Sequence, residues 1–496
     1  MVHDIKSTKA FNSFCKKLLG MHLCDFLPVC LFKSTFTASY QYSLVLSYQL
    51  TDYFGVSQFV FGLTLAIPMI VSVPVILTTP MIIRKVGLSS KQFLLAAAFL
   101  VSLGALLIAV SLTLRNFGMF FFASVLSQAL AYPCATLSMN TIIAGRCQVS
   151  SRVPSLMMGL NIVSDLTSIG AHFFYSPSLL EATIGYDGAL YIVCGCNVVA
   201  AAIVWFFLSA EDIMEKTEKV GKGASFSYWE SIKKLPVGIW YLALLGLALN
   251  FIQQFLRFIP NYFESIGVSV DVALASSSLV YAMKVVSLIP AGLALSLLGS
   301  ERTGFGRAAV LLIGGVLLFG SGMMLAFCKD LSTMVYGYSC VSSAGKQFVA
   351  LFVQSLPKAI LLQHFAQGTL EMEAMIMTSY AIISAAKYGP ITAVGTMLVY
   401  STDILGPIST ISTVCAMAGL VLVLTLVPFF WKSLRLALVD DSETKCAGRA
   451  EALEEETFAR APAVGLADTP SMASISTGTS AMGSADDELE VVNQIV

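Results

Sequence analysis

Residues 94–110 read LLAAAFLVSLGALLIAV, an unbroken apolar run without a charged side chain. Three further stretches are equally free of charge: YIVCGCNVVAAAIVWFF at 191–207, AAVLLIGGVLLFGSGMML at 308–325 and VCAMAGLVLVLTLVPFF at 414–430. A helix that is apolar on every side has no face for water, so it packs against lipid and neighbouring helices. These four stretches therefore predict a membrane protein.

The composition of the whole chain agrees with this prediction. Of its 496 residues, 56% are hydrophobic and only 12% are charged, whereas a soluble protein carries about 25% charged residues. Such a chain cannot cover a water-exposed surface with charge, so we expect the lipid bilayer to be its solvent. The net charge is −1 and the sequence has no long basic block, so we expect no nucleic-acid partner.

Residues that carry enzyme chemistry are scarce. The chain has 4 His and 11 Cys, and the cysteines are scattered, without the spacing of a metal site. A membrane-embedded enzyme would need a constellation such as HExxH or paired intramembrane aspartates. We therefore expect no enzymatic activity, no metal and no cofactor. We expect a monomeric functional unit whose partner is a small-molecule solute.

Twelve membrane spans are predicted when apolar runs are counted at the roughly 20 residues that a spanning helix needs. They lie at 26–50, 57–79, 92–114, 117–141, 154–176 and 187–209, and then at 238–260, 273–298, 307–328, 332–356, 373–397 and 408–431. The predicted domains are an N-terminal cytoplasmic segment 1–25, a six-helix bundle 26–209, a cytoplasmic linker 210–237, a second six-helix bundle 238–431 and a tail 432–496. The tail is acidic and rich in Ser, Gly, Ala and Thr, so we expect it to be disordered and cytoplasmic.

The positions of lysine and arginine predict the orientation, because cytoplasmic loops collect them. With the N-terminus inside, the inner loops carry most of these residues, among them Lys16, Lys17, Arg84, Lys85, Arg146, Arg152, Arg302, Arg307, Lys358 and Lys432. The outer loops carry only Arg115 and Lys329. This bias fits twelve spans with both termini in the cytoplasm.

The spans between the four charge-free stretches carry polar residues at helical spacing. Span 5 has Asn161, Asp165, Ser168 and His172, and span 10 has Ser339, Ser343, Lys346, Gln347 and Gln354. Spacings of three, four and seven place each set on one helix face. A charge left in lipid costs about 2.5–3.5 kcal/mol even on insertion scales, so these faces need a common watery lumen.

A charge-free helix at every third position, repeated four times, resembles the major facilitator superfamily. In that family the third helix of each triplet packs outside, the others line a central cavity, and 3+3 repeats are nested in each half. The resemblance implies an all-α integral membrane protein with two pseudo-symmetric six-helix bundles. It also implies transport of a solute by alternating access.

Two loops are similar to the G-x-x-x-D-R-x-G-R-R motif that follows the second and eighth helices of the family. We interpret the matching residues as gating loops: Arg84, Lys85 and Gly87 in the first, and Glu301, Arg302, Gly304 and Arg307 in the second. Pro80 stands where the first glycine is usual and Arg84 where the acid is usual. In the family this acid helps to lock one state of the cycle, so the first half departs from the pattern.

Two narrower resemblances point to different solutes. Gln253-Gln254 and the following segment 260–267 resemble the seventh helix and loop of sugar porters, in which paired glutamines bind a sugar. The segment Thr378–Lys387 is similar to the eleventh helix of monocarboxylate and oxalate-type organic-anion porters, although Ala381 replaces a glycine. A first-span lysine such as Lys33 is also a feature of monocarboxylate porters. Both solute classes stay open on these resemblances.

The charges inside the spans favour the anion. Lys33, Arg257, Lys284, Lys346 and Lys387 stand against one central acid, Asp165, and an excess of buried cations attracts an anionic substrate. Lys33 and Arg257 lie nearer the span ends, where a long side chain can reach the interface.

The predicted substrate-binding residues are Lys284, Lys387, Tyr380, Gln253, Gln254, Asn250, Arg257, Lys346, Lys33 and Tyr281. Asp165 is expected to be a fixed counter-ion or a proton-coupling group. We expect a secondary-active or facilitative transporter of a small polar organic solute, favoured as a carboxylate. A hexose-type sugar transporter and a non-transporting nutrient sensor are the alternatives.

Overall fold

The computed structural model describes residues 21–147, 152–175, 180, 183–208, 228–257, 262–263, 266–297, 305–365, 370–389, 393–394 and 402–430. The chain divides into two compact units, Met1–Asp441 and Ser442–Val496, and all described residues belong to the first. The predicted tail 432–496 and most of the predicted N-terminal segment lie outside the described residues.

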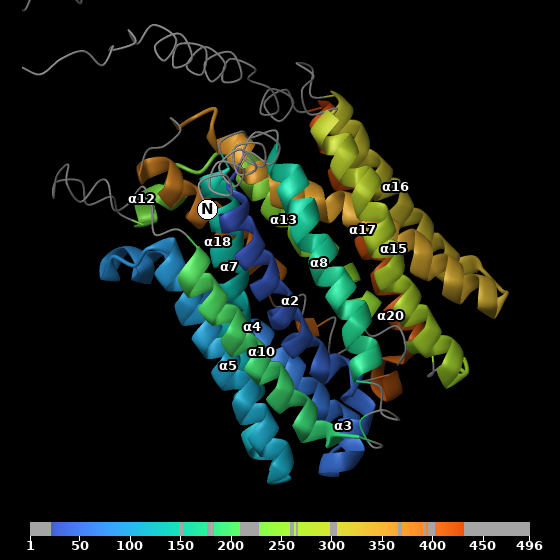
Figure 1. Ribbon diagram of the computed structural model, residues 1–496. Helices are drawn as coiled ribbons and strands as arrows, with labels where there is room; N and C mark the ends of the chain where they lie inside the picture. Colours follow the sequence, from blue (N-terminus) through green and yellow to red (C-terminus); the bar gives the residue numbers. More distant parts are fainter. Residues whose placement is uncertain are drawn as a thin grey trace, which may run out of the picture. The chain divides into compact units, whose positions relative to one another are not determined.

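A helix covers each of the twelve predicted ranges, in whole or in part. The first half of the chain forms α2 (Leu23–Val45), α3 (Ser47–Phe54), α4 (Gln58–Val86), α5 (Ser90–Thr113), α6 (Phe117–Val125), the π-helix η1 (Leu126–Ala131), α7 (Tyr132–Arg146), α8 (Val153–Phe174) and α10 (Gly185–Phe207) (Figure 1). The second half forms α12 (Tyr228–Lys233), α13 (Val237–Arg257), α15 (Val270–Leu297), α16 (Phe305–Phe327), α17 (Leu331–Leu361), α18 (Leu370–Lys387) and α20 (Thr402–Phe430). Below, these two groups of helices are called the N-half and the C-half.

Among the described helices, seven stretches are long and apolar enough to cross a membrane: Gln58–Ile83, Ser90–Thr113, Phe117–Arg146, Gly185–Phe207, Ser278–Leu297, Gly306–Phe327 and Thr410–Phe429. An eighth forms if α12 and α13 count as one span bent by 91°. Pro236 lies in the three-residue break 234–236, where its missing N–H interrupts the helix. The protein is thus an all-helical, multi-span membrane protein in its described parts.

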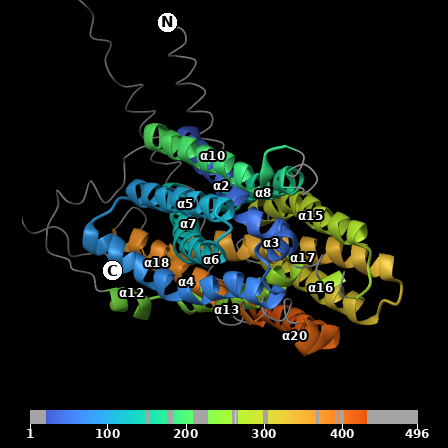
Figure 2. The ribbon, with the colours of Figure 1, turned by 90° about the horizontal axis from the view of Figure 1, so that it is seen from below.

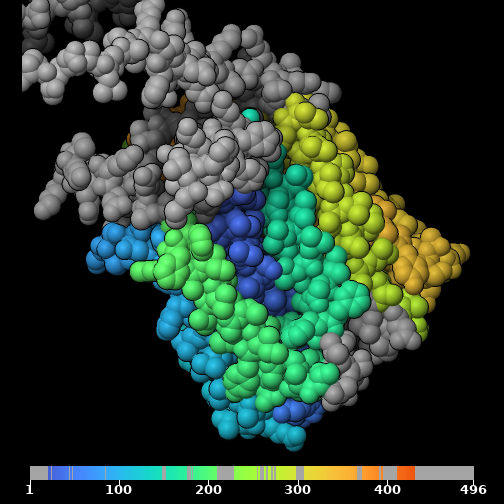
Figure 3. Space-filling view, in the orientation of Figure 1, coloured from blue at the N-terminus to red at the C-terminus, as the bar shows by residue number. Residues whose placement is uncertain are grey.

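The four charge-free helices, α5, α10, α16 and α20, lie on the outside. They expose large apolar side chains such as Phe99 (66%), Phe206 (78%) and Val423 (61%), which lipid covers. Figure 2 shows α10 and α20 at opposite edges of the bundle. The helices α2, α8 and α15 lie side by side, with α8 in contact with both of the others, as Figure 3 also shows from one face. The prediction that the charge-free third helix of each triplet packs on the outside is confirmed for the described residues.

Two predicted boundaries were too short, and each correction moves cations from a loop into a helix. α4 continues past Pro80 to Val86, so Arg84 and Lys85 lie in its last turn. α17 continues to Leu361 and includes Lys358. Lysine and arginine are good helix formers, so the end of an apolar run underestimates the helix.

Candidate functional site

A polar cavity lies between the N-half and the C-half. Its solvent-accessible volume is about 140 Å³, and one water occupies roughly 10–15 Å³ on this measure, so it suits a small solute. The lining side chains come from α2, α7 and α8 on one side and from α13, α15, α17 and α18 on the other. The outer helices α5, α10, α16 and α20 contribute none of the described lining residues.

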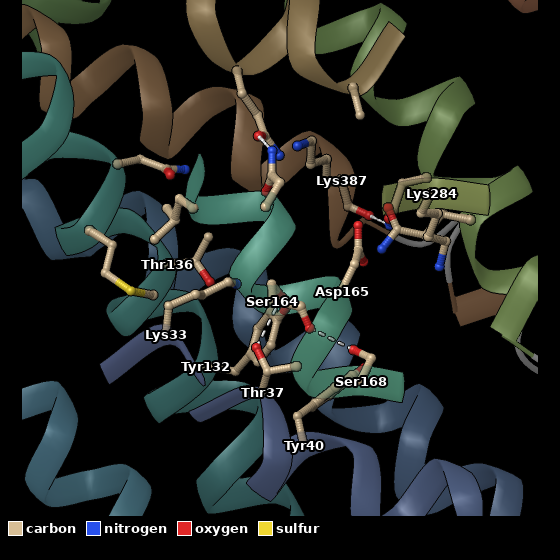
Figure 4. A pocket seen from close by; sticks show the side chains of 18 of the residues that line it. Lys33, Thr37, Tyr40, Tyr132, Thr136, Ser164, Asp165, Ser168, Lys284 and Lys387 are labelled. Atoms are coloured by element: carbon tan, nitrogen blue, oxygen red, sulfur yellow. Dashed lines mark hydrogen bonds between the residues drawn. The ribbon is translucent and has the colours of Figure 1, made fainter. Parts of the chain in front are cut away.

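Charge in this cavity is mostly positive. Its described lining contains four lysines, Lys33, Lys284, Lys346 and Lys387, and one carboxylate, Asp165. Figure 4 shows Lys33, Lys284, Lys387 and Asp165 around the same space. Lys33, Lys284 and Lys346 are all less than one-tenth exposed. Burial of cations around one open space predisposes it to an anion.

Asp165 lies at the centre of this charge distribution. Its Oδ2 accepts a hydrogen bond of 2.8 Å from Nε2 of Gln347 on α17. The positive charges of Lys284, Lys346 and Lys33 act on it. This arrangement agrees with a counter-ion role, and proton coupling by Asp165 stays a prediction.

Hydrogen bonds cross between the halves within the lining. The Asn161 amide on α8 donates to Oε1 of Gln354 on α17 at 2.7 Å. The Gln41 amide donates to Ser168 at 2.9 Å and to the hydroxyl of Tyr281 at 3.1 Å. The Asn161–Gln354 and Gln41–Tyr281 pairs join side chains from different predicted bundles, so a change in the separation of the bundles must break these two bonds, whereas Gln41–Ser168 lies within the N-half.

Aromatic rings form one wall of the cavity. Tyr132 of α7 contacts Phe36 and Tyr40 of α2, with ring centroids 4.7 and 4.6 Å apart, and Tyr388 beyond α18 at 5.8 Å. The π-helix η1 ends directly before Tyr132, and Pro133 follows it. A π-turn shifts the register of every later side chain. It sets the direction in which Tyr132, Thr136 and Asn140 of α7 face.

Lys387 is placed by the end of its own helix. α18 ends at Lys387, shortly before Pro390. A proline disfavours the helical conformation of the residue that precedes it, so a helix usually ends before this point. The Asn250 side chain of α13 donates a hydrogen bond to the Lys387 carbonyl. The Lys387 side chain passes close to Gly246, where an added Cβ would lie 3.5 Å from Cε. α13 therefore holds both the backbone and the side chain of Lys387.

Most of the predicted substrate-binding residues meet in this cavity. Its lining includes Lys33, Asn250, Gln253, Tyr281, Lys284, Lys346 and Lys387. The side chains of Gln254 and Arg257 lie outside the described residues. Tyr380 is buried behind the lining, where its hydroxyl donates to the Gln354 carbonyl at 2.7 Å. Its predicted role as a substrate ligand stays a prediction, and its observed contact positions α17.

Lys33, a predicted substrate-binding residue near the start of its span, is 8% exposed and lines the cavity instead of reaching the interface. Two aromatic residues of the lining were missed from the sequence. Tyr132 and Tyr388 stand in or beside apolar runs, where an aromatic residue is more often core. The only signal for Tyr388 was its place next to Lys387 and Gly389-Pro390.

The predicted gating loops are described only in part. Gly87 has φ +72°, and the N–H groups of Gly87 and Leu88 both bond to the Ile83 carbonyl. Gly87 therefore ends α4 in a tight left-handed turn, and the gating role of this loop stays a prediction. Lys91 donates to the Leu208 carbonyl at the end of α10 (2.6 Å). The Arg84 side chain and Glu301, Arg302 and Gly304 lie outside the described residues.

Comparison with known proteins supports the same fold. A family model described as the Major Facilitator Superfamily matches residues 29–384, whereas no curated protein matches the chain. The E. coli fucose:proton symporter FucP has 15% identity and a TM-score of 0.58, covering 81% of this chain and 98% of its own. The proton:xylose symporter XylE has 13% identity and a TM-score of 0.59, covering 86% and 98%. The human organic anion transporter MFSD10 has 13% identity and a TM-score of 0.56, covering 82% and 97%.

Proposed function

Because the chain belongs to the major facilitator superfamily, a family of secondary transporters, we propose that it moves a small organic anion, favoured as a carboxylate. The observation that carries this proposal is the charge of the cavity, in which four described lysines surround one carboxylate. Buried cations are costly in a membrane unless something compensates them. A substrate that supplies negative charge gives these lysines a role in binding.

We propose alternating access as the mechanism, with twelve spans in two bundles and both termini cytoplasmic. The cavity lies between the halves, and the bonds Asn161–Gln354 and Asp165–Gln347 cross that boundary. Rocking of one half against the other would break these bonds and reopen the cavity on the opposite side. The lysine and arginine bias of the loops supports the orientation.

A sugar is the second candidate, and the amides in the lining favour it. Gln253, Asn161 and Gln354 lie in the cavity, and amide side chains both donate to and accept from hydroxyl groups. The fucose and xylose symporters share the fold, as does the organic anion transporter, so fold likeness does not separate these candidates. A non-transporting sensor is the candidate of another class.

Uptake into proteoliposomes tests the proposal. Radiolabelled carboxylates are compared with hexoses for the wild type and for Lys284→Gln and Lys387→Gln. A hydrogen bond to a charged group is worth about 1.5–3 kcal/mol, so we expect each variant to raise the carboxylate KM by about tenfold to a hundredfold. Lys329→Gln, at an exposed position after α16, is the matched control and should transport normally.

Three outcomes separate the candidates. Hexose uptake that survives both lysine substitutions would overturn the anion in favour of the sugar. Binding of a carboxylate without any flux would favour the sensor. Carboxylate flux that fails only in the cavity variants supports the proposal.

A further inference from the structure

The cavity has two chemically different ends, and the first is built from cations and aromatic rings. The Lys33 amine is buried, with its Nζ 5.3 Å from the ring centroid of Phe36 and 6.0 Å from that of Tyr132. The face of an aromatic ring attracts a cation. This attraction leaves the formal charge of Lys33 in place, so an anion can still bind to the Lys33 amine.

Lys387 adds a second charge at this aromatic end. Lys33, Tyr132 and Lys387 all line the same cavity. Tyr388, the next residue, contacts the Tyr132 ring. Lys33 belongs to α2 and Lys387 to α18, so the two like charges come from different halves. A carboxylate between them would offset their repulsion and could accept hydrogen bonds from both.

The second end is built from amides around a carboxylate. Asp165 accepts a hydrogen bond from Gln347, and Asn161 donates to Gln354. Lys284 and Lys346 offset the charge of Asp165, and Lys33 of the aromatic end adds to them; Lys284 Nζ also lies 3.9 Å from the centroid of the Tyr281 ring. This amide end holds charges of both signs and several neutral donors and acceptors.

A second carboxylate group would meet repulsion from Asp165 at the amide end. A hydroxyl group would not, because it can donate to a carboxylate or an amide oxygen and accept from an amide N–H. A neutral sugar would satisfy the amide end but would leave Lys33 and Lys387 without an anion between them. A plain fatty acid would place a hydrocarbon chain against the amide end. The polar groups of that end would then lose hydrogen-bond partners, which is unfavourable.

We propose that the substrate is a hydroxylated monocarboxylate, a hydroxy acid or sugar acid, with its carboxylate between Lys33 and Lys387 and its hydroxyl groups at the Asp165–Gln347 end. This inference rests on the proposed anion transport and specifies its substrate class. It also accounts for the presence in one cavity of lysines, which suit a carboxylate, and amides, which suit a sugar.

A matched set of compounds tests the proposal by competition. Six-carbon probes are gluconate, glucose, hexanoate and adipate, and three-carbon probes are lactate, glycerol, propionate and malonate. Their binding to the purified full-length chain is measured by the shift of its Tm, and their uptake by counterflow in proteoliposomes. Within the six-carbon or the three-carbon set, whichever binds, we expect the hydroxylated monocarboxylate (gluconate or lactate) to bind at least tenfold more tightly than the other three compounds of that set.

Substitutions at each end should change different preferences. Lys33→Gln should reduce the preference for the acid over the neutral polyol by tenfold or more, and Lys33→Arg should retain most of it. Gln347→Leu should instead reduce the preference for the hydroxylated over the plain acid. The Tm of each variant without ligand establishes that it is folded. If Lys33→Gln does not fold, Lys387→Gln replaces it, with the same expected loss of preference for the acid over the neutral polyol, and Gln347→Leu still tests the other end.

The results distinguish this inference from the function on which it rests. Tightest binding of a dicarboxylate or a plain acid would overturn the hydroxylated class and leave anion transport standing. Tightest binding of the neutral polyol, unchanged by Lys33→Gln, would overturn both. Selective loss of the two preferences in the two variants supports the inference.

Discussion

Replacing Gly345 by leucine should abolish folding of the C-half, because α16 and α17 cross there with no room for a side chain. A Cβ at Gly345 would lie 2.8 Å from the backbone nitrogen of Leu318 and 2.9 Å from the Gly314 carbonyl oxygen. At Gly314, a Cβ would lie 2.8 Å from Cγ2 of Val349 and 3.1 Å from the Gly345 carbonyl oxygen. Close approach at small residues is a principal means by which helices associate in lipid.

Backbone atoms cannot rotate away as a side chain can, so the helices must separate. Overpacking a protein core costs about 1–3 kcal/mol, and occasionally more, and we expect Gly345→Leu to lie at or above the upper end of this range. The measurement is the yield of monodisperse protein in detergent, followed by its Tm. Gly320→Leu is the matched control on α16, because a Cβ there meets nothing within 4 Å. A Gly345→Leu protein with the Tm of the wild type would contradict the observed crossing.

The fold was predictable because the amino-acid composition of a helix indicates directly whether the helix faces lipid. Residues 94–110 and 191–207 carry no charge since every charge facing lipid is costly, and the structure places them outside. The mid-span lysines Lys284, Lys346 and Lys387 predicted a lumen by the same reasoning. These inferences need only the average surroundings of a helix, which its sequence reports.

The details of the site were less predictable because they depend on how helices are rotated and where they end. The pairing of Asn161 with Gln354 joins residues 193 positions apart, and each helix face alone does not identify its partner. Tyr132 faces the cavity behind a π-helix whose extra residue changes the register. Lys358 was assigned to a loop, whereas it lies in α17 and is 2% exposed. A periodic pattern specifies a face, and it does not specify these local shifts.

Replacing Lys358 by methionine should weaken the closure of the cavity at one end. The Lys358 amine on α17 donates a hydrogen bond to the Cys147 carbonyl, the C-cap of α7. A cation at a helix C-terminus is also favoured by the helix dipole. At the same end, Ser155 and Ser296 share a hydrogen bond of 2.8 Å, and a Cβ at Gly292 would lie 2.2 Å from Sδ of Met158. The two halves are thus in contact at the end predicted to be cytoplasmic.

The expected size follows from the lost bond. A hydrogen bond to a charged group contributes about 1.5–3 kcal/mol, so Lys358→Met should shift the balance between the closed and open states of this end by about tenfold or more. Cys147 is fully buried in the closed state and serves as the probe. In a chain whose other cysteines are replaced by serine, we expect its alkylation by a membrane-permeant maleimide to accelerate about tenfold. Lys329→Met should leave the rate unchanged.

This contact also bears on the gating motif that the N-half lacks. Arg84 stands where related motifs carry an acid that helps to hold one state, so that ionic lock cannot form as the resemblance implies. The bond from Lys358 to the end of α7 connects the two halves without that acid: the cation comes from the C-half, and a helix terminus of the N-half supplies the negative end. If Cys147 reacts equally fast with and without Lys358, the closure depends on packing at Met158 and Gly292 instead. In that case Gly292→Leu, and not Lys358→Met, should open this end.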